Sequence, residues 1–325
     1  MSSRIQLNWF DERLAERARA ISDGRLDAAP ARDAATVVII RPWNGGPEGA
    51  PPGGYGGTGS PPVSRGGLGG IVPPGAVGLG GIVPPEGIEI LMMKRPGTMK
   101  FAAGAYVFPG GRVDEADADP RIGWHGPSPE DFGDKLGAAP DEARALVVAA
   151  VRETYEESGV LLAGTPDGST VIPSGPDWDA DRAAIRAGEL SFPDLLVKHG
   201  LVILADRIVP WARWITPAVE PRRYDTRFFA AVVPPGQTVD GHLAEADKIA
   251  WVAPDDALGA ARAGEIMLLP PTATTLNEFA AVADDLAGFL GQHREIKPIQ
   301  PDILVEDGQV WLVVPEEAEY PRGVL

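Results

Sequence analysis

Apolar residues recur along the chain in two patterns, short β-branched runs and longer stretches with helical spacing. The run at residues 35–41, ATVVIIR, is continuous and β-branched, which predicts a buried strand. Leu161 and Leu162 are predicted to begin another strand. Similar runs predict further strands at residues 87–95, 105–108, 207–216, 226–233 and 247–252.

The helical spacing predicts an amphipathic helix over residues 8–22 and a longer helix that begins near Pro140 and ends at Ser158. Between the turn at 109–111 and Pro140 we expect a long loop. Further helices are predicted as two short segments within 177–200, from Pro254 to about Ala263, and over 271–291. The tail predicts a hairpin around Asp307-Gly308. Strands and helices alternate without a regular βαβ repeat, so we predict an α+β fold, a mixed-sheet sandwich with helices on its faces.

A Gly- and Pro-rich segment lies between the first two predicted strands. It covers residues 44–86 and contains GLGGIVPP twice, at 67–74 and 78–85. Such a composition buries too little apolar surface to offset its ordering entropy, so we predict a flexible insertion; a functional clamp or a partner-binding loop is the alternative. The predicted organisation is a helix and first strand (1–43), this insertion (44–86), a core (87–265) with an insertion at 118–140 and a helical cap at 175–200, and a C-terminal helix and hairpin (266–325).

The composition narrows the classes of partner. The chain has 325 residues, with 46 Asp plus Glu against 29 Lys plus Arg, a net charge of −17. This charge argues against nucleic acid or an anionic membrane as the main partner, but a phosphorylated small molecule remains open because a bound divalent metal reverses the local sign. The absence of cysteine excludes disulfides, thiolate catalysis and Cys-ligated metals. With no signal-peptide pattern and no apolar run of about 18 residues, a cytoplasmic protein is expected; a homodimer is left open.

Three carboxylates stand on the last turns of the predicted helix that begins near Pro140. Glu153, Glu156 and Glu157 are spaced i, i+3 and i+4, which places them on one face. Like charges at this spacing repel, and the C-terminal end of a helix disfavours anions. A cation relieves that cost, and oxygen-only ligands suit Mg²⁺, Mn²⁺ or Ca²⁺. The alternative is a solvated acidic face.

The glycine turn and this helix together resemble the signature of the Nudix family, GX5EX7REUXEEXGU, where U is bulky and aliphatic. The matching positions are Gly111, Arg152, Glu153, Glu156, Glu157, Gly159 and Val160. Thr154 departs from the pattern, and the acid six residues after Gly111 is Asp117, which 34 residues separate from Arg152. The family's first-Glu role is therefore not assigned to Asp117.

The resemblance implies a Nudix-type α/β/α sandwich and a metal-dependent hydrolase that uses Mg²⁺ or Mn²⁺. It implies that Glu153, Glu156 and Glu157 hold the metal beside a diphosphate, and that Arg152 orients a catalytic Glu. Gly111, like Gly159, is expected to permit a backbone conformation that a Cβ would penalise.

The general base is expected outside this signature, as it is in several branches of the family. Glu245, in HLAEADKIAWVAP, is the first candidate and Asp247 the second. The alternative is a surface acid in a polar loop.

The segment ILMMKRPGTMKFAAGAYVFPGG resembles the coenzyme A diphosphatase pattern LLTXRSX3RX3GX3FPGG. Arg95, Gly104 and the stretch from Phe108 through Gly111 match at the same spacing, while Lys100 replaces an Arg. The resemblance implies that Arg95 and Lys100 bind substrate phosphates next to Gly110 and Gly111; the alternative is that they are ordinary cations flanking a strand. The implied substrate is coenzyme A or an acyl-coenzyme A.

Other readings stay open at this point. ADP-ribose, a nucleotide sugar or a dinucleotide is the alternative substrate, and a catalytically silent binding or scaffold protein is the alternative class. Arg222, Arg223 and Arg227 are expected either to hold a phosphate or to pair with acids. Strand aromatics usually pack, so Trp211 and its aromatic neighbours are predicted to be core residues.

Overall fold

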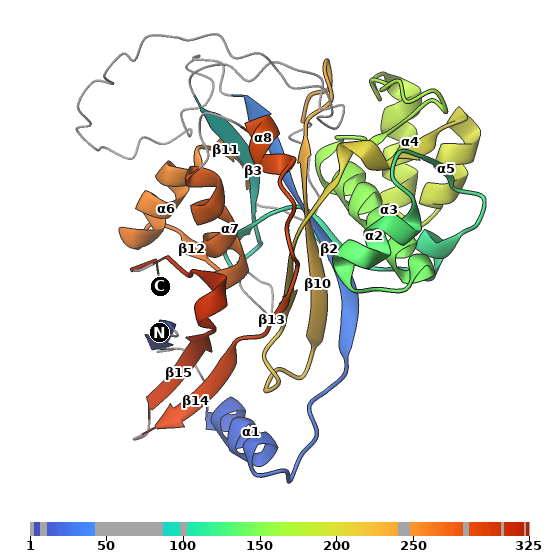
Figure 1. Cartoon of the computed structure of the whole chain (residues 1–325). Helices are drawn as coiled ribbons and strands as arrows, with labels where there is room; N and C mark the ends of the chain where they lie inside the picture. The colour runs from blue at the N-terminus through green and yellow to red at the C-terminus, as the bar shows by residue number, and fades with distance from the viewer. Residues whose placement is uncertain are drawn as a thin grey trace, which may run out of the picture.

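A computed structural model describes residues 3–6, 12–42, 87–97, 103–239, 248–281, 286–306, 309–321 and 323–324. A mixed β-sheet lies between two layers of helices (Figure 1). The central strand β2 (Ala31–Pro42) explains the layering, because its side chains alternate between two separate cores. Val37 and Ile39 pack into one core, and Val38 and Ile40 into the other. The predicted α+β sandwich is confirmed.

In the described residues the central sheet has nine strands, and its hydrogen-bonded path runs β12-β4-β3-β2-β10-β9-β13. β11 pairs with β3, and β5 pairs with β2. β10 runs parallel to β2 and antiparallel to β9, so the sheet is mixed as predicted. The other strands of this sheet are β3 (Ile88–Lys94), β4 (Ala105–Val107), β5 (Gly110–Arg112), β9 (Val209–Ile215), β10 (Arg223–Val232), β11 (Lys248–Val252), β12 (Met267–Leu268) and β13 (Pro298–Ile299).

The helices α2, α3, α4 and α5 form one layer, and α6, α7 and α8 lie on the opposite side of the sheet (Figure 1). The first layer consists of α2 (Pro129–Leu136), α3 (Pro140–Ser158), α4 (Pro176–Arg186) and α5 (Phe192–His199). The second consists of α6 (Pro254–Arg262), α7 (Pro270–Ala280) and α8 (Leu286–Leu290). The aromatic side chains predicted to be core are buried: Trp211, Trp214, Phe228 and Phe229.

Two small sheets complete the described fold. The predicted C-terminal hairpin is confirmed as β14 (Asp302–Glu306) and β15 (Gln309–Val314), and its turn lies outside the described residues. Strand β1 (Ser3–Gln6) pairs with β15 and precedes α1 (Glu12–Ser22), so both ends of the chain meet in one sheet. The other small sheet has the order β6-β8-β7, with β6 (Gly123–His125), β7 (Ala163–Gly164) and β8 (Val202–Leu204).

The segment that leads to α3 is not the long loop that the sequence predicts. It contains β6 and the two-turn helix α2, which contacts α3. A capping box begins α2: Ser128 accepts a hydrogen bond from the Asp131 backbone, and the Asp131 carboxylate accepts one from the Ser128 backbone. Gly137, in the left-handed region at φ 61°, ends it. These end signals were present in the sequence.

The strand predicted to begin at Leu161 begins instead at Ala163. The reason is a side chain that takes the place of a neighbouring strand. The Gln237 amide donates to the Leu161 carbonyl at 3.0 Å and accepts from the Leu161 N–H at 2.8 Å. The backbone at Leu161 is therefore satisfied by Gln237.

The single helix predicted over residues 271–291 is two helices, α7 and α8. In one straight helix, Phe279 and Phe289 would lie about 15 Å apart along the axis. Their ring centroids lie 5.5 Å apart, and both pack on Trp211, at 4.6 Å and 4.8 Å. Packing around Trp211 therefore overrides the continuous helical pattern.

The Gly- and Pro-rich stretch between β2 and β3 lies outside the described residues. Within the described residues, no helix is both long enough and apolar enough to cross a membrane.

Candidate active site at the C-terminal half of helix α3

Helix α3 carries the acidic cluster, and its two ends are well defined. Pro140 occupies the first turn, where its missing N–H costs nothing, and two acids in that turn complement the helix dipole. At the other end Gly159, at φ 78°, adopts the left-handed conformation and donates its N–H to the Tyr155 carbonyl. The helix therefore ends at Ser158, with Glu153, Glu156 and Glu157 on its last two turns.

The glycine turn lies directly against these carboxylates. Gly110 donates its backbone N–H to Glu157 Oε2 at 2.8 Å. A Cβ placed on Gly111 would come within 2.3 Å of Glu153 Oε1, and one placed on Gly110 would come within 2.5 Å of the Ala35 carbonyl oxygen. The structure thus brings the predicted glycines and glutamates together.

The expected reason for Gly111 is wrong. Gly159 does have a positive φ, but Gly111 does not appear among the described glycines with positive φ. Its missing side chain instead makes room for the Glu153 carboxylate. The constraint at Gly111 is therefore steric contact with the acidic cluster and not its backbone dihedral angles.

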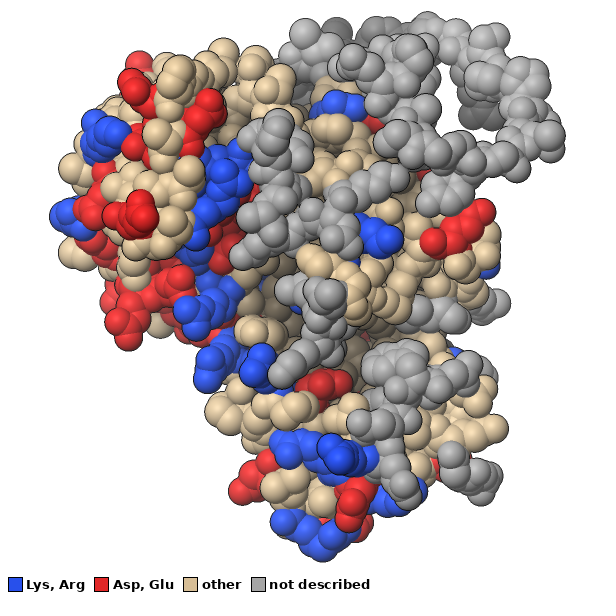
Figure 2. Space-filling model, turned by 180° about the vertical axis from the view of Figure 1, so that it is seen from behind, with Lys and Arg blue, Asp and Glu red and all other residues tan. Residues whose placement is uncertain are grey.

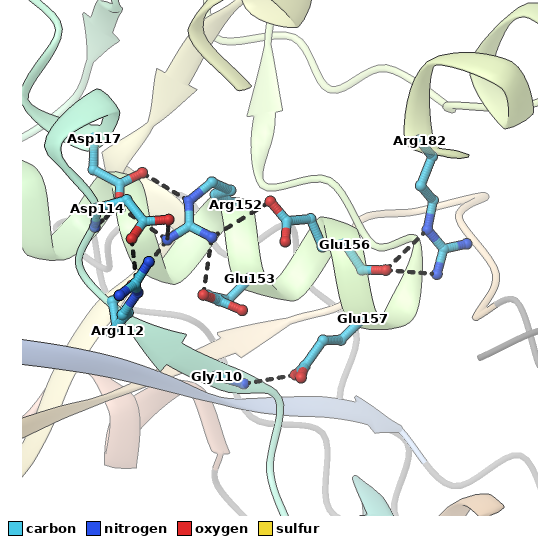
Figure 3. A network of polar contacts seen from close by, with 9 residues as sticks. All are labelled: Gly110, Arg112, Asp114, Asp117, Arg152, Glu153, Glu156, Glu157 and Arg182. Carbon is cyan, nitrogen blue, oxygen red and sulfur yellow. Dashed lines mark hydrogen bonds and ion pairs between the residues drawn. The ribbon is translucent and has the colours of Figure 1, made fainter. Parts of the chain in front are cut away.

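Arg152 is the centre of the polar network (Figure 3). Its Nε and Nη2 donate to the two carboxylate oxygens of Asp117 at 2.8 Å and 3.0 Å. Its Nη1 donates to Glu153 at 2.9 Å and to Glu156 at 3.4 Å, and its Nη2 also donates to the Arg112 carbonyl at 2.9 Å. The guanidinium thereby fixes two of the three glutamates against the glycine turn.

Asp117 completes this network from the insertion. Asp117 is fully buried at 0 % exposure, and Arg152 is 7 % exposed. The Asp114 backbone N–H donates to Asp117 Oδ2 at 2.8 Å, at the start of the short 3₁₀ helix Glu115–Ala118. In this structure Asp117 holds Arg152, a role that the sequence did not assign.

Burial and mutual repulsion disfavour the charged forms of the carboxylates in the acidic cluster. Burial raises the pKa of Glu153 to about 7 although Arg152 opposes the shift, and the neighbouring Glu156 raises it further. Burial also raises the pKa of Glu156 against the opposing effect of Arg152. Arg152 therefore does not fully compensate the carboxylates, and a further cation would favour their charged forms.

The donor set suits a hard divalent metal, because all three side chains offer carboxylate oxygens. Within the described ranges, no three acidic or imidazole groups already converge as a metal site. Glu157 points toward the Gly110 N–H, whereas Glu153 and Glu156 point toward Arg152 (Figure 3). To share one ion, these side chains would have to turn away from their present protein donors.

The structure shows an additional cation that the sequence analysis missed. Arg182, on α4, donates from Nε and Nη2 to the Glu156 carbonyl oxygen at 3.3 Å and 3.2 Å. This contact satisfies an otherwise unpaired carbonyl at the end of α3. No local motif links Arg182 to the acidic cluster, so only the tertiary structure identifies it.

The remaining predicted site residues divide into two groups. Arg95 follows β3, and its backbone pairs with Ala105 and Gly104 across the hairpin that leads to the glycine turn. Its Nε is buried and has no partner among the described residues. Lys100, Glu245 and the alternative base Asp247 lie outside the described residues.

Two arginines of the basic cluster near β10 are engaged by protein groups, and of these Arg227 pairs with acids. Arg227 is 1 % exposed and forms ion pairs with Asp33, Glu142 and Asp225. Arg223 donates to the Ala29 and Thr216 carbonyl oxygens. Both contacts favour the structural reading of these arginines.

A solved structure and a family model both resemble this chain. A crystal structure of a NUDIX hydrolase from Alicyclobacillus acidocaldarius superimposes with a TM-score of 0.59 at 26% sequence identity, covering 82% of this chain and 98% of that chain. A family model described as the NUDT19 Nudix domain matches residues 125–278, which include α3 and the strands β9 to β11.

Sequence relatives agree with that class. The chain is 34% identical over 222 residues to putative nudix hydrolase 7 of Caenorhabditis elegans, covering 68% of this chain and 65% of the relative. It is 29% identical over 283 residues to the acyl-coenzyme A diphosphatase NUDT19 of Homo sapiens, covering 71% of this chain and 72% of the relative. The chain thus spans just under two thirds of the nematode protein. In both sequence and fold the chain is similar to Nudix hydrolases.

Proposed function

We propose that this protein is a metal-dependent hydrolase that cleaves the diphosphate linkage of coenzyme A or an acyl-coenzyme A. The observation that carries the proposal is that Glu153 and Glu157 lie against the Gly110–Gly111 turn, while Arg152 bonds to both Glu153 and Glu156. An uncompensated, oxygen-rich cluster beside a tight glycine turn suits a divalent cation and a bridging diphosphate.

In this proposal Glu153, Glu156 and Glu157 would hold Mg²⁺ or Mn²⁺. The bound cation would neutralise diphosphate charge and lower the pKa of an attacking water. Arg152 keeps Glu153 and Glu156 in position, and Asp117 keeps Arg152 in position. Before the cation binds, the Gly110 N–H holds the Glu157 carboxylate in place.

The reaction forms one bond from the water oxygen to phosphorus and breaks one bridging P–O bond. The water gives up a proton to a general base, for which Glu245 is the first candidate and Asp247 the second, and the leaving phosphate accepts a proton from solvent. Coenzyme A would give 4′-phosphopantetheine and adenosine 3′,5′-bisphosphate. Arg95, whose buried Nε has no partner in the described part of the chain, is the proposed phosphate contact together with Lys100.

The surface charge is compatible with an anionic substrate. Seen from behind, Lys and Arg side chains gather in a band where the lobe of α2–α5 meets the rest of the molecule, although acidic side chains cover much of that lobe (Figure 2). A positive band on a protein of net charge −17 provides a local attraction for phosphates.

The test compares substrates directly. The protein is incubated with coenzyme A, an acyl-coenzyme A, ADP-ribose, a nucleotide sugar and a dinucleotide, each with Mg²⁺ or Mn²⁺, and products are followed by phosphorus NMR. We expect cleavage of coenzyme A or its acyl derivative. Cleavage of ADP-ribose with coenzyme A left intact would overturn the substrate assignment. Retained turnover in both Glu156→Gln and Glu157→Gln would overturn the catalytic assignment.

A further inference from the structure

A cavity of about 530 Å³ opens beside the C-terminal end of α3. Tyr155 and Gly159, on either side of the acidic pair Glu156 and Glu157, belong to its lining. Arg182, which also lines it, donates to the Glu156 carbonyl oxygen. The cavity therefore begins within one helical turn of the proposed metal ligands. Its volume falls in the range of about 300–1,000 Å³ that is typical of small-molecule sites.

The two loops that form part of its wall are tied together by a buried side chain. Gln237 is 8 % exposed and precedes the lining residues Thr238 and Val239. Its amide bonds to both backbone groups of Leu161 and donates to the Val171 carbonyl at 2.7 Å. Because one side chain fixes both loops to the end of α3, this wall is preorganised.

Another part of the cavity lining is Trp178, whose ring is held in place by neighbouring side chains. Trp178 stacks on His199 with ring centroids 3.9 Å apart and meets Tyr155 edge-on at 6.4 Å. The Asp181 carboxylate holds the α5 end in place, accepting from Lys198 at 2.6 Å and contacting His199 at 2.8 Å. An aromatic platform held on both sides is suited to packing against an apolar or planar group.

The chemistry of the lining selects against a phosphate. Among the described residues of the lining, Arg182 is the single Lys or Arg, and the Glu156 carbonyl already engages its guanidinium. Asp179 adds a carboxylate, and Ser174 adds a hydroxyl. Aromatic surface with hydroxyl and carboxylate acceptors fits a neutral chain that carries amide N–H or hydroxyl donors.

We infer that this cavity binds the neutral, amide-bearing arm of the substrate, on the far side of the diphosphate from the nucleotide, and that Trp178 is a specificity-determining residue. The inference rests on the proposed function. It assigns to α4 and α5 the recognition of the arm, and it leaves recognition of the nucleotide phosphates to the Arg95 side of the site.

The first experiment measures the two halves of the substrate separately. For wild type, Trp178→Ala and Ser174→Trp, the KM for coenzyme A is compared with the inhibition constant of adenosine 3′,5′-bisphosphate. Ser174 is exposed, so its replacement fills the cavity without disturbing the core. Both variants should raise KM about tenfold and leave nucleotide inhibition unchanged. Val197→Ala, at an apolar residue of α5 that is 54 % exposed, is the matched control and should change neither constant.

Two outcomes overturn the inference: an unchanged KM in both cavity variants, or equal changes in KM and in nucleotide inhibition. A second measurement separates this failure from failure of the proposed function. Saturation-transfer NMR detects binding of pantetheine, which has the arm but no diphosphate, to metal-free protein. If wild type does not hydrolyse coenzyme A, loss of the pantetheine signal in Ser174→Trp still supports the cavity assignment. Absence of any pantetheine signal in wild type overturns it.

Discussion

Replacing Gly111 with alanine should displace a carboxylate of the acidic cluster and lower turnover, while the stability of the fold changes little. The new Cβ would lie 2.3 Å from Glu153 Oε1, whereas ordinary van der Waals contact begins at 3.4 Å. The carboxylate must therefore retreat by about 1 Å, a displacement that costs on the order of 10²-fold in rate when it affects a catalytic group. We expect turnover of coenzyme A to fall about 100-fold, which is about 2.7 kcal/mol of transition-state stabilisation.

The fold should tolerate the same change. The colliding atom is the end of a flexible side chain, and Gly111 is not among the described glycines with positive φ. The main loss is the hydrogen bond from Arg152 to Glu153, worth about 1–2 kcal/mol. Thermal unfolding followed by circular dichroism should therefore move by only a few degrees, at roughly 2–4 °C for each kcal/mol.

Two comparison variants make this test sharp. Gly110→Ala places a Cβ 2.5 Å from the Ala35 carbonyl oxygen and 2.7 Å from the Thr36 Cα, so it collides with backbone and should destabilise the fold. Glu153→Asp draws the carboxylate back, so its cost should be smaller in the Gly111→Ala background than in wild type. Wild-type turnover in Gly111→Ala, or unfolding as severe as in Gly110→Ala, would refute the reasoning.

Three further substitutions test the polar contacts around Arg152, at Glu157 and at Asp181. Asp117→Asn removes the buried carboxylate that accepts from Arg152 Nε and Nη2 and should cost about 3 kcal/mol in urea unfolding; a loss below about 1 kcal/mol would contradict the assignment. Glu157→Gln keeps an acceptor for the Gly110 N–H, so the unfolding temperature should hold while turnover falls on the order of 10²-fold or more; equal losses of both would count against it. Hydrogen bonds from Lys and His side chains of α5 lower the pKa of Asp181. The stability lost in Asp181→Asn, about 1 kcal/mol at neutral pH, should therefore shrink as the pH falls from the unfolded pKa of about 4 through the lower folded pKa, and a gap that stays constant across this fall would contradict the assignment.

The part of the site that the sequence predicted is the part that is local in the chain. Glu153, Glu156 and Glu157 share a helix face because of their spacing, and the helix ends at Gly159 because that glycine adopts a left-handed conformation. The strand that precedes the glycine turn, β4, was also readable from its β-branched and aromatic run. Helical periodicity and end signals act over a few residues, so they remain visible without tertiary structure.

The contacts that the sequence did not predict join segments far apart in the chain. Arg182 reaches the Glu156 carbonyl from another helix, and Gln237 reaches Leu161 across 76 residues. Neither contact has a fixed spacing or a residue motif, because a hydrogen bond between distant segments depends on how the helices pack. The same holds for the pairing of β1 with β15. By contrast, the capping box at Ser128 is local, so the start of α2 was readable from the sequence although a loop was predicted there.

The cost of gathering acids at the end of α3 leads to a last prediction, on Glu156→Gln. Burial raises the pKa of Glu156 despite Arg152, so the charged carboxylate destabilises the folded state at neutral pH. The neutral amide should therefore raise the unfolding temperature of the metal-free protein, by a few degrees for a gain of about 1 kcal/mol, while lowering turnover. Added Mg²⁺ should stabilise wild type more than the variant, because the ion binds the folded carboxylates.

The matched control for that experiment is Glu189→Gln. Glu189 is exposed just after α4, and its replacement removes one negative charge from the same total of −17. If general self-repulsion explains the stabilisation, both variants will gain equally, and Mg²⁺ will not distinguish them. If the acidic cluster explains it, only Glu156→Gln will be stabilised without metal, and only that variant will lose the response to Mg²⁺. Removal of the Glu156 charge stabilises the variant, and a divalent ion stabilises wild type. Both effects measure the same local repulsion, so they must change together.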